Sequence, residues 1–269
     1  RRCDPERVSP GVAQAVLAHI TGKGKAWLLA FGEAPLAPVD AALYIDMLER
    51  LNAGEPLPHL LGEREFYGYP FTVTPDVLIP RPETESLVDL ALRWCREQGM
   101  SAPRLVDVGT GSGAIALTLA LELPDAEVTG IEISPEALAI ARVNAERHGL
   151  AGRVSLCEDS LLDTEPGPFD IIIANLPYIN SEEIEALEVG RWEPRVALDG
   201  GTDGLMLIRA LLEQAPSRLA RPGLLLLEMG HDQGQHVCEL CQERFPAGQV
   251  TLHRDLAQLD RIVEVRLPA

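Results

Sequence analysis

The sequence lacks a surplus of positive charge and a long apolar run. Its 23 Lys and Arg residues stand against 41 Asp and Glu residues, which gives a net charge of −18. Proteins that grip a phosphate backbone usually carry a basic face. Naked nucleic acid is therefore disfavoured as a partner, and a protein or a small molecule fits better. No apolar run is long enough to span a bilayer, so no membrane association is expected.

Cysteine and histidine are too scattered to predict a disulfide framework or a metal site. The five cysteines are Cys3, Cys95, Cys157, Cys238 and Cys241. Their irregular spacing fits a reducing compartment and predicts a cytoplasmic protein. The histidines show no metal-ligand spacing, so no metal is expected. No signal peptide is visible, and the missing initiator Met predicts a chain trimmed at its start.

The first part of the chain is patterned for helices. Apolar residues recur at helical spacing over residues 12–20 and again over 39–51. We expect a small helical domain over residues 1–61. Two short aromatic runs about Gly68 then predict a β-hairpin linker over residues 62–82.

From residue 83 to residue 269, strand and helix patterns alternate. The expected strands cover residues 104–108, 127–131, 154–157, 169–174, 223–229, 249–253 and 261–267. The expected helices cover residues 84–97, 113–121, 135–148, 203–219 and 232–243. This alternation predicts a Rossmann-like α/β domain, with a mostly parallel seven-stranded sheet and helices on both faces. In such sheets, ligands bind at the carboxyl ends of the strands, near the topological switch point.

A glycine-rich turn follows the first of these strands. The segment is Asp107-Val108-Gly109-Thr110-Gly111-Ser112-Gly113. Its glycines permit a tight turn and a close approach of a ligand to the backbone. Glu132 ends the next strand, where its carboxylate can accept from both ribose hydroxyls, and Asp159 and Ser160 follow the third strand, near the expected place of an adenine amino group. Asp107 suits a cationic methionine ammonium and is awkward beside a pyrophosphate.

The tetrapeptide Asn175-Leu176-Pro177-Tyr178 follows the fourth expected strand. Methyl transfer builds positive charge on the attacking nitrogen, and an amide nitrogen is a poor nucleophile. The side-chain carbonyl of Asn175 and the backbone carbonyl of Leu176 are suited to accept from its N–H groups. Pro177 biases Leu176 toward an extended conformation, and Tyr178 can lie against a planar group. Together with the glycine turn, this segment predicts a methyltransferase that acts on an amide or an exocyclic amine.

With these residues in view, nearly the whole chain resembles the peptide chain release factor glutamine methyltransferases. The matching segments are residues 78–85 (Leu-Ile-Pro-Arg-Pro-Glu-Thr-Glu), 107–116, 192–194 with 197–204, 225–228, and 254–256 with 260–261. The resemblance implies methyl transfer from S-adenosylmethionine to the glutamine of the Gly-Gly-Gln motif in class I release factors, with S-adenosylhomocysteine as product.

The resemblance also implies roles for individual residues. Gly109 to Gly113, Glu132, Asp159, Ser160 and Asn175 would bind the cofactor, and Asn175 to Tyr178 would grip the substrate glutamine. The helical domain would bind a more distant part of the release factor. We expect a monomer that makes no direct contact with nucleic acid.

Two departures from the family pattern keep alternatives open. The chain starts after the family's first helix, which we expect to reduce affinity for the release factor. Leu176 replaces a proline of the usual Asn-Pro-Pro-Tyr; we expect tolerance, because the proposed role uses a backbone carbonyl. Ribosomal RNA adenine methyltransferases also carry Asn-Leu-Pro-Tyr, so methylation of adenine N6 is the alternative function.

Less favoured alternatives are a nicotinamide-dependent oxidoreductase and a catalytically dead binding module. The oxidoreductase stays open because Gly109-x-Gly111-x-x-Ala114 satisfies the relaxed dinucleotide fingerprint. Arg81 and Glu83 either position the substrate or tie the hairpin to the catalytic domain.

Overall fold

The computed structural model describes residues 8–269, so Cys3 lies outside the described residues. The chain divides into two compact units, and the boundary in the sequence falls between Glu63 and Arg64. We call residues 64–269 the catalytic unit and the preceding part the helical unit. Within residues 8–269, no helix combines the length and the apolar character that crossing a membrane requires.

Within the described residues 8–63, the helical unit contains two long and two short helices. They are α1 (Pro10–Thr21), α2 (Lys25–Ala30), α3 (Pro38–Asn52) and α4 (Leu57–Leu61). The side chain of Ser9 caps α1 by accepting from the backbone N–H of Val12. The sequence predicts α1 and α3, but α2 and α4 are too short to establish a periodic pattern. Val16, Met47 and Leu51 form the small buried core.

The hairpin consists of β1 (Glu63–Phe66) and β2 (Tyr69–Thr72). Tyr67 and Gly68 form its two-residue turn with φ of 54° and 79°, as a tight hairpin of this kind requires. The rings of Phe66 and Phe71 are buried edge to face, 6.2 Å apart, in the same core as the catalytic sheet. The hairpin therefore packs on the catalytic unit. The division into residues 1–61, 62–82 and 83–269 stays a proposal.

A seven-stranded sheet forms the centre of the catalytic unit. Its strands are β3 (Arg104–Val108), β4 (Glu127–Glu132), β5 (Val154–Glu158), β6 (Phe169–Ala174), β7 (Leu219–Glu228), β8 (Gln249–Arg254) and β9 (Asp260–Leu267). The strand order is β5-β4-β3-β6-β7-β9-β8. Only β9 in this sheet runs against its neighbours. The predicted mostly parallel, seven-stranded architecture is confirmed.

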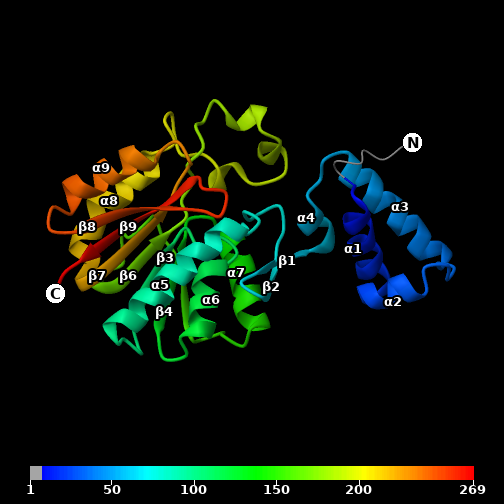
Figure 1. Ribbon diagram of the computed structural model, residues 1–269, viewed down its shortest axis with the longest axis horizontal. Coiled ribbons are helices and arrows are strands. Elements are labelled where there is room, and N and C mark those ends of the chain that lie inside the picture. Colours follow the sequence, from blue (N-terminus) through cyan, green and yellow to red (C-terminus); the bar gives the residue numbers. More distant parts are fainter. Residues whose placement is uncertain (1–7) are drawn as a thin grey trace. The chain divides into compact units, whose positions relative to one another are not determined.

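Helices cover both faces of this sheet (Figure 1). On one face lie α5 (Glu85–Gln98), α6 (Ala114–Glu122) and α7 (Pro135–Arg147), and on the other lie α8 (Met206–Arg218) and α9 (Gly234–Arg244). The central strands are mostly apolar and mostly buried, as expected for a parallel sheet covered on both sides.

The largest error in a predicted helix boundary lies at the start of α8. The sequence predicts a helix from Asp203, but α8 begins at Met206. The carboxylate of Asp203 accepts from the backbone N–H of Leu205 at 3.1 Å and stabilises a turn before the helix. The following strand, β7, begins at Leu219 rather than at Gly223.

The strand order creates a switch point beside β3. From β3 the chain proceeds outward through β4 to β5, and it then returns to form β6 on the other side of β3. The loops after β3 and β6 consequently leave the same edge of the sheet in opposite directions. These loops contain the glycine turn and the Asn175–Tyr178 tetrapeptide, so the fold brings both predicted motifs to one crevice.

Candidate active site

The glycine turn is anchored to β4 and shaped by three glycines with different surroundings. The backbone N–H groups of Gly109 and Thr110 both donate to the carbonyl of Ile131, at 2.9 and 2.8 Å. All three glycines have positive φ. A Cβ on Gly109 would lie 3.1 Å from the side chain of Leu176, whereas a Cβ on Gly111 would meet no atom within 4 Å. Gly109 thus permits packing between the two motifs, and Gly111 leaves space open.

Asp107 lies buried beneath the turn. Its Oδ2 accepts from the hydroxyl of Thr110 at 2.6 Å and from the backbone N–H of Ala116 at 3.2 Å. Burial raises the pKa of Asp107 to about 7. Its Oδ1 is buried and has no hydrogen-bond partner among the described residues. The carboxyl group therefore stabilises the turn from below, and its predicted contact with a methionine ammonium stays a prediction.

Glu132 is held in place by three backbone N–H groups. One oxygen accepts from Gly111 at 2.8 Å, and the other accepts from Ile133 at 2.9 Å and Ser134 at 3.0 Å. The side chain is almost fully buried, yet it lines the main cavity. The carboxylate is consequently oriented in advance, with lone pairs remaining for hydroxyl donors.

Asp159 is braced in the same way. It accepts from the backbone N–H of Ser160 at 2.8 Å, and from the backbone N–H and hydroxyl of Thr164 at 2.9 and 2.8 Å. Partial burial opposes ionisation, but these hydrogen bonds outweigh it and lower the pKa of Asp159. The next residue but one, Leu161, has a φ of 54°, which is uncommon for a leucine and turns the chain along the cavity wall.

These loops enclose a cavity of about 360 Å³. The predicted site residues that line it are Gly109, Gly111, Glu132, Asp159, Ser160, Asn175, Leu176 and Pro177. Apolar walls come from Val77, Val108, Ile131, Ile133, Ala137 and Leu161. Asp107, Thr110, Ser112, Gly113 and Tyr178 do not line it. The lining fits a nucleoside with an apolar portion: two fixed carboxylates can accept from hydroxyl or amino groups, and a glycine leaves room beside them.

The tetrapeptide borders the main cavity and a second one. The second cavity, of about 130 Å³, is lined by Leu78, Arg81, Val189, Ala197, Leu198 and residues 175–179. Asn175, Leu176 and Pro177 line both cavities. Groups bound in the two cavities would meet at these residues.

The side chains of the tetrapeptide have separate environments. The Nδ2 of Asn175 donates to the hydroxyl oxygen of Thr84 at 3.2 Å. Leu176 is buried in the core. Burial, together with the nearby Glu228 carboxyl group, raises the pKa of Tyr178 to about 12, so the phenol keeps its proton at neutral pH.

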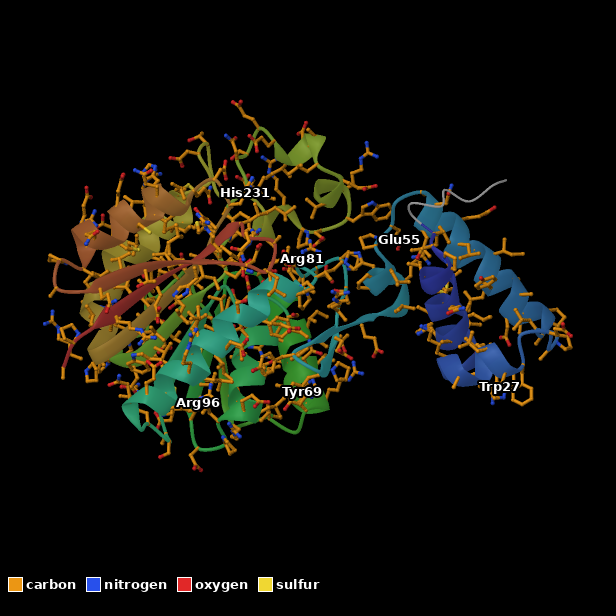
Figure 2. The ribbon with its side chains drawn as sticks, in the orientation of Figure 1. Trp27, Glu55, Tyr69, Arg81, Arg96 and His231 are labelled. Carbon is orange, nitrogen blue, oxygen red and sulfur yellow. The ribbon has the colours of Figure 1, made fainter. Side chains whose placement is uncertain are left out.

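The segment before α5 is attached to the loop around Glu193. The carboxylate of Glu193 accepts from the backbone N–H of Ile79 at 3.0 Å and from the guanidinium of Arg81 at 2.5 Å. Glu193 is buried, and Arg81 lines the second cavity. Figure 2 shows Arg81 just ahead of α5. Arg81 therefore ties this segment to the Glu193 loop. Its role toward substrate, and that of Glu83, stay proposals.

Three polar residues near the site had no role assigned from the sequence. Asn144 is buried on α7 and bonds the backbone of Thr72 and Ser112, which links the hairpin to the glycine turn. Thr84 contacts Asn175, and Glu228 ends β7. Two of these residues could have been found because a polar residue interrupts an apolar pattern. Asn144 lies on the buried face of α7, and Glu228 ends a run of four leucines.

The fold and the site together define a methyltransferase of the Rossmann-like α/β class. The family described as a methyltransferase domain matches residues 100–252, and the family described as the PrmC N-terminal domain matches residues 8–62. A solved methyltransferase from Pyrococcus furiosus has a TM-score of 0.55 at 18% identity, covering 76% of this chain and 91% of that one. This last similarity shows the fold alone.

Two relatives specify the family. The release factor glutamine methyltransferase of Bordetella pertussis is 42% identical over 255 residues, covering 93% of this chain and 92% of that protein. The enzyme of the same name from Neisseria gonorrhoeae is 49% identical over 218 residues, covering 79% and 77%. The chain belongs to the release factor glutamine methyltransferase family.

Proposed function

We propose that this protein transfers a methyl group from S-adenosylmethionine to the side-chain amide nitrogen of the glutamine in the Gly-Gly-Gln motif of class I release factors. The observation that carries the proposal is the pair of cavities that share Asn175, Leu176 and Pro177. The larger cavity has the size and the carboxylate acceptors to hold the cofactor, and the smaller one suits an amide side chain.

The larger cavity supplies the cofactor contacts. S-adenosylmethionine brings an electrophilic methyl group on a positively charged sulfur. Glu132 accepts from the ribose hydroxyls, and Asp159 with Ser160 faces the adenine. Gly111 leaves space for the ligand beside the backbone. Thr110, Ser112 and Gly113 act by shaping the turn.

The smaller cavity orients the amide. Asn175, through its side-chain carbonyl, and Leu176, through its backbone carbonyl, accept from the two N–H groups of the glutamine. These acceptors align the nitrogen and stabilise the positive charge that develops on it. Tyr178, which stays protonated, lies against the planar amide. The surplus proton is lost after transfer, so no strong general base is needed.

The helical unit suits a protein substrate. Its exposed apolar side chains include Leu29, Val39 and Ile45. We propose that this unit contacts a part of the release factor distant from its glutamine. All proposed site residues come from a single chain, and a monomer suffices for the reaction.

The experiment is a parallel assay with labelled S-adenosylmethionine. One sample contains a class I release factor, a second contains the same factor with the motif glutamine replaced by alanine, and a third contains unmodified small-subunit ribosomal RNA. Mass spectrometry then locates the new methyl group. We expect label on the glutamine and none in the other two samples. Label on RNA adenine would overturn the proposal and favour the alternative that Leu176 raised.

A further inference from the structure

Three polar side chains meet at the carboxyl ends of β6 and β7. Thr84, from the turn before α5, and Glu228, from β7, are both buried. The hydroxyl oxygen of Thr84 accepts from the Nδ2 of Asn175 at 3.2 Å. The carboxyl group of Glu228 faces both the Thr84 hydroxyl and the Asn175 amide. None of the steps described above uses Thr84 or Glu228.

The arrangement bears on which end of the Asn175 amide faces the substrate. An asparagine amide has one accepting and one donating end. The reaction needs the accepting end toward the glutamine N–H groups, since a donating end would oppose them. The reverse orientation fills the same volume, so shape alone does not distinguish the two.

Glu228 determines which end of the Asn175 amide faces Thr84. Neither of its oxygens has a well-aligned hydrogen bond among the described residues, and both are buried. A buried acceptor of this kind strongly favours any donor within reach. The proton of the Thr84 hydroxyl can rotate toward it. The Thr84 oxygen is then left as an acceptor, which only the Nδ2 end of Asn175 can satisfy.

We propose that Glu228 and Thr84 are positioning residues that form a relay, Asn175 to Thr84 to Glu228, which turns the Asn175 carbonyl toward the substrate amide. The proposal rests on the proposed function, because it assigns the relay to the orientation of a substrate amide. It also explains why the Pro82-Glu83-Thr84 turn lies against the tetrapeptide.

The charge of Glu228 sets the direction of the relay. Burial, with a smaller contribution from Glu83, raises the pKa of Glu228 to about 7, although Thr84, Arg261 and Asn175 each act to lower it. Tyr178 also faces this carboxyl group and stays neutral. Ionised Glu228 can only accept, but protonated Glu228 can donate to Thr84 and release Asn175 from its correct orientation. The kcat should therefore fall as the pH decreases through about 7.

The test compares Thr84→Val, Thr84→Ser, Glu228→Met and Glu228→Gln in methylation of a release factor. Thr84→Val keeps the shape and loses the hydroxyl, and we expect kcat to fall about 10–100-fold, less than the loss of the acceptor itself. Glu228→Met should behave similarly, and its apolar side chain suits a buried site. Thr84→Ser should retain most activity. Glu228→Gln carries both a donor and an acceptor, as the protonated carboxyl does, so it should show the reduced kcat of the wild type at low pH and lose the pH dependence.

Two controls separate positioning from general damage. Thr118→Val changes a buried threonine on α6 that lines neither cavity, so its kcat should match the wild type. In an Asn175→Ala background, Thr84→Val should change kcat less than about twofold, because the group to be oriented is gone. Calorimetry of S-adenosylmethionine binding and thermal unfolding confirm that each variant is folded.

The outcomes distinguish this proposal from the proposed function. A wild-type protein that leaves the glutamine unmethylated contradicts the proposed function itself. An active wild type with an active, pH-independent Thr84→Val overturns the relay alone. Equal losses from Thr84→Val with and without Asn175 would also overturn it, since the effect would then be structural.

Discussion

The two halves of the active site are held in place by different kinds of contact. We call the part that would bind the methyl donor, residues 109–113 with Glu132 and Asp159, the donor half. There, Glu132 and Asp159 are braced mainly by backbone N–H groups. We call the part that would bind the substrate amide, Asn175 to Tyr178, the amide half. There, the orientation of the Asn175 side chain depends on a hydrogen bond to the side chain of Thr84. Backbone donors are fixed by the fold, whereas a side-chain partner is lost by one substitution. The donor half should therefore fail through affinity for the cofactor, and the amide half through turnover.

The strongest test of this division is Asn175→Ala. Removing one oriented acceptor should lower kcat by about 10²–10³-fold. Single-turnover methylation of the release factor with saturating S-adenosylmethionine measures the change. A variant with near-wild-type kcat would remove Asn175 from the chemistry.

A substitution in the glycine turn should act on the other half. Gly111→Leu places a side chain in open space beside the cavity and at a positive φ. We expect S-adenosylmethionine affinity to fall by about 100-fold or more, since a steric block of this kind costs several kcal/mol. Calorimetry measures it. Gly68→Leu, at a positive-φ position in the hairpin turn, is the matched control and should bind the cofactor normally. Normal affinity in Gly111→Leu would show that the turn does not cradle the ligand.

Glu132→Gln tests the donor half without changing the size of the side chain, because it removes only the charge. A hydrogen bond to a charged group contributes about 1.5–3 kcal/mol, so the Kd for S-adenosylmethionine should rise roughly 10–100-fold. The kcat at saturating cofactor should stay close to that of the wild type. A fall in kcat with an unchanged Kd would reverse the assignment of the two halves.

Asp107 lets the stability of the donor half be measured without substrate. Its folded pKa of about 7 lies above the usual carboxyl value, so the folded state prefers the protonated form. Its contribution to the free energy of unfolding is full below pH 4 and is lost as the pH rises through about 7. Asp107→Asn cannot ionise. As the pH rises from about 5 to about 8, the free energy of unfolding of this variant should therefore increase by on the order of 2–3 kcal/mol relative to that of the wild type. Urea unfolding at both pH values would contradict this if the difference stayed constant.

Leu176→Pro should have the smallest effect. The proposed role of this residue uses its backbone carbonyl, and the substitution restores the family residue. The lost leucine contacts near Gly109 are the main cost. We expect kcat within about threefold of the wild type, because the oriented acceptor is retained. A gain of RNA adenine methylation in the wild type relative to this variant would indicate that Leu176 sets the substrate.

Most of the fold and the cavity follow from local sequence patterns. Strand endings located Gly111, Glu132, Asp159 and Asn175, because the carboxyl ends of parallel strands converge at one edge. The sequence did not indicate that Asp107 is buried, since burial depends on the packing of α6 over the turn. Nor did it indicate the contact of Thr84 with Asn175, which joins residues 91 positions apart in the chain.

The central claim is that donor binding and amide activation are separate tasks of the two halves. The most direct measurement is a calorimetric titration of Asn175→Ala with S-adenosylmethionine, beside the wild type and Gly111→Leu. We expect a Kd within about threefold of the wild type, because the cofactor is held mainly by the donor half. An affinity as low as that of Gly111→Leu would contradict it, and would make Asn175 chiefly a cofactor ligand.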